Sequence, residues 1–317
     1  AAPLRPAAVR SLVSLRLAKV QQERVAGMLR RFGRSSALPD RQRTLAFSGI
    51  PTGLFAPDEA EFDYLLGQLS AGQPFAQRSN AAKALAGGKL AEAQLSRLAN
   101  QLGNIGSAEA TALLPAFGWG RAASLGQALL AVLGQATWLR GLDAAMLQKA
   151  TAGYGETVQG MAAKLLAKAK AAPADQAKQL RELAGGLPGG DALRGKAVFR
   201  GPKAGCSTCH SMAYHGGQFG PDLTRIGQVR KKTDLLEAIV FPSASFVRSF
   251  ETMQVSTDDG GVLAGIIRDQ DAGQITLALS PEKNMRVDRG SIRNMEPMPV
   301  SLMPAGMNYI LSKQELA

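Results

Sequence analysis

The chain is organised around Cys206-Ser207-Thr208-Cys209-His210. This C-x-x-C-H pentapeptide contains both cysteines of the chain and one of its two histidines. Two thiols three positions apart can each form a thioether with one of the two vinyl groups of a porphyrin, and the adjacent imidazole can then ligate the iron. The pentapeptide therefore predicts one covalently attached haem c, held by Cys206 and Cys209, with His210 as the proximal iron ligand.

Three other kinds of site share parts of this pattern. A thioredoxin-like redox pair would be flanked by a βαβ pattern, which the sequence lacks, and would not require the histidine. A zinc site needs four ligands, and the adjacent Cys209 and His210 are awkwardly placed for a tetrahedral set completed by Cys206 and His215. A disulfide between Cys206 and Cys209 would close a very short, strained loop. Haem attachment is the favoured interpretation, and these three remain its alternatives.

The length and composition of the chain indicate a globular protein with two domains. Its 317 residues are 45% hydrophobic, and no run of 18 apolar residues is present, so we expect no membrane span. The sequence begins at Ala1 without Met or a signal pattern, so we expect a piece of a longer polypeptide or a processed chain. Because covalent haem attachment in bacteria takes place outside the cytoplasm, the motif predicts a periplasmic or extracytoplasmic location.

The positive charge is concentrated in the part of the chain that lacks the motif. The net charge is +12, and residues 1–50 alone hold ten basic and two acidic residues, a balance of +8. Such a cluster is typical of a solvated helix face, and it could also attract an acidic protein, anionic lipid or nucleic acid. An aromatic content of only 5% offers few stacking platforms, so we expect no nucleic-acid partner.

Residues 1–186 show helical periodicity. From Ala7 to about Leu183, apolar residues recur at spacings of three and four, and Gly, Pro or Asn interrupts the pattern at short intervals. The expected segments are a long first helix through 12–29 and shorter helices at 62–69, 81–85, 90–102, 108–117, 122–139, 144–150 and 158–169. Short helices without intervening strands predict a stack of helix pairs of the HEAT or armadillo kind, with an irregular bundle as the alternative.

Residues 187–317 predict a second domain of cytochrome c type. Leu187-Pro188-Gly189-Gly190 marks a hinge, and Asp191 is positioned to cap a helix that ends at Phe199. A proximal histidine usually donates its second N–H to an acceptor that fixes the ring. The backbone carbonyl near Pro221 is the candidate acceptor, unless Gly220-Pro221 forms only a turn. A short apolar helix is expected at 235–240.

The periodicity changes from helical to strand-like at about residue 251. Apolar residues alternate on both sides of Asp258-Asp259-Gly260-Gly261, which is a strong hairpin signal, and again through 275–279, 285–287 and 292. A small antiparallel sheet is therefore expected as an insertion around 251–298.

Met303 is the candidate for the sixth iron ligand. It precedes Pro304 in a loop, where a rigid turn could present the thioether to the iron opposite His210. Met298 and Met307 are the next candidates. His215 is a weaker one, because it follows His210 by only five residues.

The second half of the chain resembles a known family. The residues that carry the resemblance are 187–191, 195–199, 206–210, 220–224, 242–246 and 301–304. Over residues 185–317 these ordered motifs resemble the haem-binding domain of the Pirellula/Verrucomicrobium type, a cytochrome c module. The resemblance implies HEAT-like repeats before the module and a position within a larger polypeptide or complex. In that family an apolar helix continues beyond Ala317, so the contact of such a helix with Val198 and Phe199 is in doubt.

The motifs together predict an electron-transfer protein rather than an enzyme. A haem ligated by His210 and Met303 favours the relay of single electrons from a dehydrogenase to another carrier. A peroxidase-like haem enzyme with an open sixth site is one alternative. A helical scaffold subunit, for which the haem is an accessory, is the other.

Overall fold

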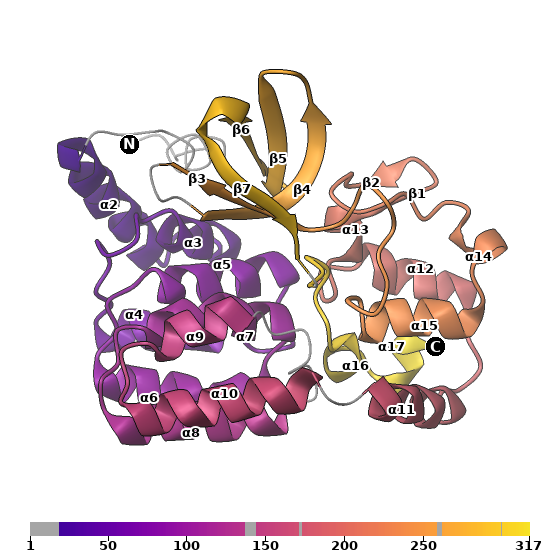
Figure 1. Ribbon diagram of the computed structural model, residues 1–317, viewed down its shortest axis with the longest axis horizontal. Helices are drawn as coiled ribbons and strands as arrows, with labels where there is room; N and C mark the ends of the chain where they lie inside the picture. The colour runs from indigo at the N-terminus through magenta and orange to yellow at the C-terminus, as the bar shows by residue number, and fades with distance from the viewer. Residues whose placement is uncertain (1–18, 137–143, 171–172, 259–261, 299) are drawn as a thin grey trace. The chain divides into compact units, whose positions relative to one another are not determined.

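A computed structural model describes residues 19–136, 144–170, 173–258, 262–298 and 300–317. The chain is mainly helical with a small antiparallel sheet, so the predicted fold class is confirmed at that level (Figure 1). It forms two compact units, of which unit 1 ends at Ala172 and unit 2 runs from Pro173 to Ala317. None of the helices in the described part of the chain is both long and apolar enough to span a bilayer.

Unit 1 consists of helices joined by short connections. Its helices are α2 (Lys19–Arg34), α3 (Asp40–Ser48), α4 (Glu59–Gly67), α5 (Phe75–Ala86), α6 (Glu92–Gln101), the 3₁₀ turn η1 (Leu102–Asn104), α7 (Ser107–Phe117), α8 (Ala123–Gln135), α9 (Ala144–Thr151) and α10 (Glu156–Lys170). The helices expected in unit 1 from residue 62 onward are present with ends shifted by several residues, and residues 137–139 of the expected helix 122–139 lie outside the described residues. The first part of the expected helix 12–29 lies outside the described residues, and α3 was not expected.

Helices of unit 1 pack against the helix after next in the chain. Contacts join α3 to α5, α5 to α7 and α7 to α9, and on the other side α6 to α8 and α8 to α10. Fully buried leucine and phenylalanine side chains such as Leu65, Phe62 and Phe117 fill the space between them. Alternate helices therefore form two rows around a continuous apolar core.

Unit 2 contains seven α-helices within its described residues. They are α11 (Pro173–Gly185), α12 (Ala192–Arg200), α13 (Cys206–Cys209), α14 (Ile226–Val229) and α15 (Lys232–Val240) before the sheet, and α16 (Met307–Ile310) and α17 (Lys313–Leu316) after it. The two compact units divide between residues 172 and 173, whereas the sequence predicts a domain boundary between residues 186 and 187. Helix α11 packs against α15 and belongs to unit 2, so the Pro-Gly segment after α11 is a connection inside that unit.

The last helices of the chain pack against the helix that precedes the pentapeptide. Helix α17 contacts α12, and the side chains of Val198 and Leu316 pack on the same buried cluster. The members of that cluster are Ala204, Met307, Ile310 and Leu311. Lys203 Nζ also lies 2.7 Å from Glu315 Oε2. In this chain the short helix α17 therefore packs against α12, near Val198, where the family resemblance implies contact with a longer C-terminal helix.

The inserted sheet has five antiparallel strands in the order β6-β5-β4-β3-β7. The strands are β3 (Met253–Thr257), β4 (Val262–Gln270), β5 (Gln274–Ser280), β6 (Lys283–Asp288) and β7 (Ile292–Pro297). Their alternating apolar residues fill a core that includes Val255, Ile275, Leu277 and Val287. Irregular pairing at Ile267/Asp269 and elsewhere marks β-bulges, which bend the sheet and turn individual side chains.

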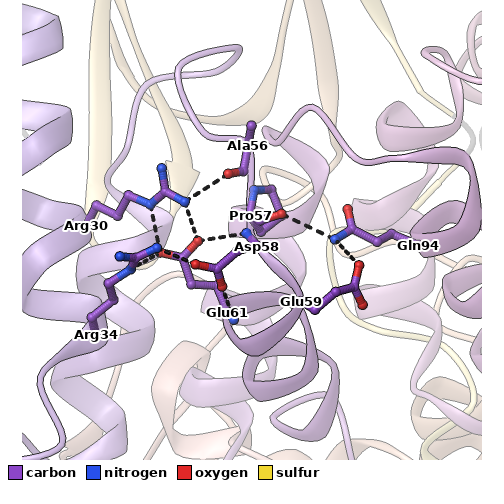
Figure 2. A network of polar contacts seen from close by, with 8 residues as sticks. All are labelled: Arg30, Arg34, Ala56, Pro57, Asp58, Glu59, Glu61 and Gln94. Carbon is purple, nitrogen blue, oxygen red and sulfur yellow. Dashed lines mark hydrogen bonds and ion pairs between the residues drawn. The ribbon is translucent and has the colours of Figure 1, made fainter.

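A network of charged side chains joins the helices at the start of unit 1. The Glu61 carboxylate, whose side chain is 3% exposed, accepts hydrogen bonds from Arg30 Nη2 at 2.6 Å and from Arg34 Nε at 2.7 Å (Figure 2). Glu61 also forms a reciprocal capping box with Asp58 at the start of α4. Gln94 of α6 donates to Pro57 O and to Glu59. The network thus connects α2, α4 and α6.

The arginines determine the charge state of Glu61. Burial alone would raise the pKa of this carboxyl, but the hydrogen bonds from Arg30 and Arg34 outweigh burial and hold the pKa below its ordinary value of 4.5. A carboxyl group whose pKa is lowered by folding stabilises the folded state above its ordinary pKa. That contribution disappears as the pH falls through the lowered value.

We expect Glu61→Gln to lower the free energy of unfolding by about 2 kcal/mol at neutral pH, because two partly exposed arginines lose their buried anion. The thermal midpoints of the variant and the parent should converge as the pH falls below the ordinary pKa of a carboxyl group. Glu23→Gln, at an exposed position on α2, is the matched control and should leave the midpoint unchanged. A loss that is the same at acidic and at neutral pH would contradict the role given to the ionised carboxylate.

Candidate functional site

The two cysteines lie at the ends of one short helix. Helix α13 spans Cys206–Cys209 and begins after Gly205, whose φ of +68° favours glycine. Residues three positions apart lie on the same face of a helix, so both thiols are on one side of the turn. The N–H of His210 donates to Cys206 O at 2.9 Å and ends the helix. Both cysteines are free thiols and both are half-buried.

The imidazole of His210 is held by the backbone of the following loop. Its Nδ1 atom lies 2.8 Å from Pro221 O. Because a carbonyl oxygen can only accept, Nδ1 carries the proton and the Nε2 lone pair is left for a metal. This is the contact predicted for the carbonyl near Pro221, and a proximal haem histidine requires the same arrangement.

Two glycines let this loop approach the motif closely. A Cβ on Gly220 would lie 2.5 Å from Cε1 of the His210 ring, and a Cβ on Gly217 would lie 2.0 Å from Thr208 O. The Gly217 N–H donates to Ser207 O at 2.8 Å, and the Gly220 N–H donates to Cys209 O at 2.7 Å. The loop thus follows the turn of α13 and forms a seat for the imidazole ring.

The surroundings of the cysteines do not suit a redox thiol pair. Burial raises the pKa of the Cys206 thiol. Burial, together with the charges of Glu282 and Cys206, raises the pKa of Cys209 to about 11. Thioredoxin-like pairs need a lowered thiol pKa, because the thiolate is the reactive form. The alternative of a redox thiol pair is therefore disfavoured, because neither cysteine has the lowered thiol pKa that such a pair needs.

The zinc alternative also lacks support from the geometry. Among the described residues, which include Cys206, Cys209, His210 and His215, no group of three or more Cys, His, Asp or Glu side chains could hold a metal ion. His215 lies on the exposed strand β2 (His215–Gly216), which pairs with β1 (Ser211–Met212).

The environment of the motif fits a large, flat apolar group. From residue 191 to 235, all of which are described, only Ala204 and Gly205 are buried. Several large apolar side chains of unit 2 are only half-buried, namely Val198, Phe199, Phe219, Leu223, Ile226, Phe246 and Met303. A porphyrin attached to the thiols could cover apolar side chains of this kind. A thiol pair next to an oriented imidazole is the set of groups that a covalently attached haem uses.

Met303 lies in a loop that is anchored at both ends. Ser301 N donates to Ser243 Oγ at 3.0 Å, and Gly306 N donates to Val240 O at 3.2 Å. Met303 is half-buried, whereas Met307 belongs to the buried cluster beside Cys206. The assignment of Met303 as the sixth ligand stays a prediction.

One residue near the motif was missed from the sequence. Arg268 lies at the bulge of β4, and its guanidinium carbon is 5.7 Å from the ring centre of Phe219 and 5.6 Å from that of Phe250. Phe219 immediately precedes Gly220, so this stack connects the inserted sheet to the loop that holds His210. A bulge cannot be recognised from alternation alone, and the sequence carried no other signal for this contact.

Comparison with known proteins adds no family assignment. No family model matches the chain, and no curated protein matches it significantly. The resemblance of residues 185–317 to the Pirellula/Verrucomicrobium type of haem-binding domain therefore rests on the ordered motifs alone.

We expect Gly220→Ala to lower the free energy of unfolding by about 1–3 kcal/mol, because the added methyl group displaces the His210 ring from Pro221 O. Nitrogen NMR of the imidazole should show loss of the protected Nδ1–H. Gly227→Ala is the matched control, since a Cβ at Gly227 meets no atom within 4 Å. Equal stability of the two variants would show that the ring does not depend on the glycine seat.

Proposed function

We propose that unit 2 is a monohaem c-type cytochrome domain that transfers single electrons. The observation that carries the proposal is the hydrogen bond from His210 Nδ1 to Pro221 O. It holds the ring of the histidine that ends the C-x-x-C-H motif. Cys206 and Cys209 would form the thioethers, and His210 and Met303 would ligate the iron. A haem bound in this way supplies a one-electron couple. The protein fixes the ring of the proximal ligand and limits the access of water.

Two further observations support this function over a zinc or disulfide role. The cysteines are free thiols on one face of a helical turn. The turn is followed by a loop whose glycines, Gly217 and Gly220, permit close approach of the backbone. A disulfide would consume both thiols, and a structural zinc site, although it also uses free thiols, does not need a glycine loop against the imidazole ring. An imidazole that must stand beside a porphyrin benefits from such a loop.

Unit 1 is proposed as a HEAT-like docking domain. Its support is the packing of α3 on α5, α5 on α7 and α7 on α9 in one series and of α6 on α8 and α8 on α10 in another, because helices of stacked pairs also contact the helix after next. In such stacks every repeat contacts only its neighbours, and the two rows of helices offer long surfaces for other proteins. The proposal for unit 1 rests on this packing and on the resemblance of residues 185–317 to the Pirellula/Verrucomicrobium type of haem-binding domain. That resemblance implies HEAT-like repeats before the module.

The proposed setting is extracytoplasmic, with a redox protein as partner. A dehydrogenase, in the same polypeptide or in a complex, would deliver electrons, and another carrier would receive them. This part of the proposal depends on covalent haem attachment, because attachment in bacteria takes place outside the cytoplasm.

Met303→Ala should remove the low-spin, methionine-ligated absorption spectrum of the reduced protein while the haem stays covalently attached. Met298→Ala is the matched control, because Met298 lies at the end of the sheet and is the other half-buried candidate; its spectrum should match the parent. An unchanged methionine-ligated spectrum in Met303→Ala would exclude Met303 as the ligand.

The parent protein should also take up one electron per haem and bind cyanide slowly, because the sixth site is filled. Rapid binding of cyanide or peroxide to the resting iron would favour the peroxidase-like alternative. Redox titration followed by absorbance measures the first property, and stopped-flow mixing measures the second.

A further inference from the structure

A short hairpin next to the motif exposes an aromatic side chain. Strands β1 and β2 are joined by Ala213 and Tyr214, both of which have positive φ, at 51° and 65°. Left-handed backbone costs an L-residue roughly 1–2 kcal/mol. The ring of Tyr214 is nevertheless 97% exposed. A two-residue hairpin turn accounts for positive φ at both positions. The exposure of the Tyr214 ring is not explained by packing within unit 2.

The hairpin is held rigidly against the loop that fixes His210. Leu223 N donates to Ser211 O at 2.8 Å, and Ala213 N donates to Thr224 Oγ1 at 2.9 Å. The Ser211 hydroxyl donates to the Asp222 carboxylate at 2.5 Å. Tyr214 is therefore presented on a turn whose position is set by the residues directly after the Pro221 contact. Interfaces commonly use a rigid, pre-positioned aromatic side chain of this kind as an anchor.

An open groove of about 370 Å³ lies beside Tyr214. It is lined by Tyr214, Asp222, Thr224, Arg225, Ile226 and Val229. Val229 is 72% exposed, so the groove has an uncovered apolar side next to the tyrosine ring. The acidic side chain on its wall, Asp222, is already occupied by hydrogen bonds from Ser211 and from Thr224 N.

The rim of the groove is strongly basic. The segment from Thr224 to Thr233 contains four basic residues and no acidic residue. The four are Arg225, Arg230, Lys231 and Lys232, and all are exposed. Within the described residues none of them takes part in an ion pair. Such a rim attracts acidic surfaces over distances of about a Debye length and repels basic ones.

We propose that this hairpin surface, formed by Tyr214, Val229, Arg225, Arg230 and Lys232, docks an acidic protein. The partner would place Asp or Glu side chains against the basic rim and an apolar side chain in the groove beside Tyr214. A single projecting ring does not provide the row of stacking platforms that nucleic acid needs. The surface also lacks the broad apolar helix face that lies in a lipid interface. The binding of an acidic protein to this surface does not depend on the proposed function. Only the role of that protein as an electron carrier does.

The test uses two synthetic probes, both short peptides of glutamate and glycine, one with a central leucine and one with a central serine. Binding to the full chain is followed by fluorescence anisotropy at about 0.02 M and about 0.2 M salt. The leucine peptide should bind more tightly than the serine peptide, and binding should weaken at the higher salt. Haem content is recorded separately from the absorption spectrum, so failure of haem attachment and failure of docking give different results.

Three variants locate the binding. Arg230→Glu/Lys232→Glu should weaken binding of the leucine peptide by about tenfold or more, whereas Lys283→Glu/Arg286→Glu, an equal charge change at exposed positions of β6, should not. Tyr214→Asn should also weaken binding without lowering the thermal midpoint, because Asn tolerates positive φ. Equal losses in the two charge variants, no binding of the leucine peptide, or equal binding of both peptides would overturn the proposal. So would tighter binding to phosphatidylserine vesicles than to the peptide.

Discussion

The hydrogen bond between His210 Nδ1 and Pro221 O is the contact on which the organisation of the candidate site depends. It requires Gly220 to lie against the imidazole ring without a side chain, and it fixes the path of the chain immediately after Pro221. That path carries the hydrogen bonds that hold the hairpin at Ser211 and Ala213. The orientation of the His210 ring therefore affects both the expected ligation of the iron and the position of the hairpin that carries Tyr214.

The two units achieve stability in different ways. Unit 1 buries many large apolar side chains, and polar contacts such as the bonds from Arg30 and Arg34 to Glu61 join α2 to α4. In unit 2 the buried side chains form small clusters, one beside Cys206 and one within the sheet. Small cores of this type commonly need a covalent or metal-centred cross-link. A haem bound through Cys206 and Cys209 would meet that need.

Much of this arrangement could be predicted from the sequence. Apolar spacing located the helices α4 to α10, α12 and α15 and the strands β3 to β7, because each element buries one face and therefore shows its own period. The contact at Pro221 could be anticipated because a proximal histidine needs an acceptor. The turn at Ala213 and Tyr214 could not, since neither residue signals positive φ. The contact of Arg268 and the assignment of α11 to unit 2 depend on tertiary packing, which local patterns do not encode.

The most direct measurement of the central claim is the intact mass of the purified chain after production in a host with a c-type haem maturation system. The account predicts that the mass of the denatured chain exceeds the polypeptide mass by one haem. The same measurement on Cys206→Ser/Cys209→Ser should return the mass of the polypeptide alone. A parent chain that leaves this host folded and at its polypeptide mass would contradict the account.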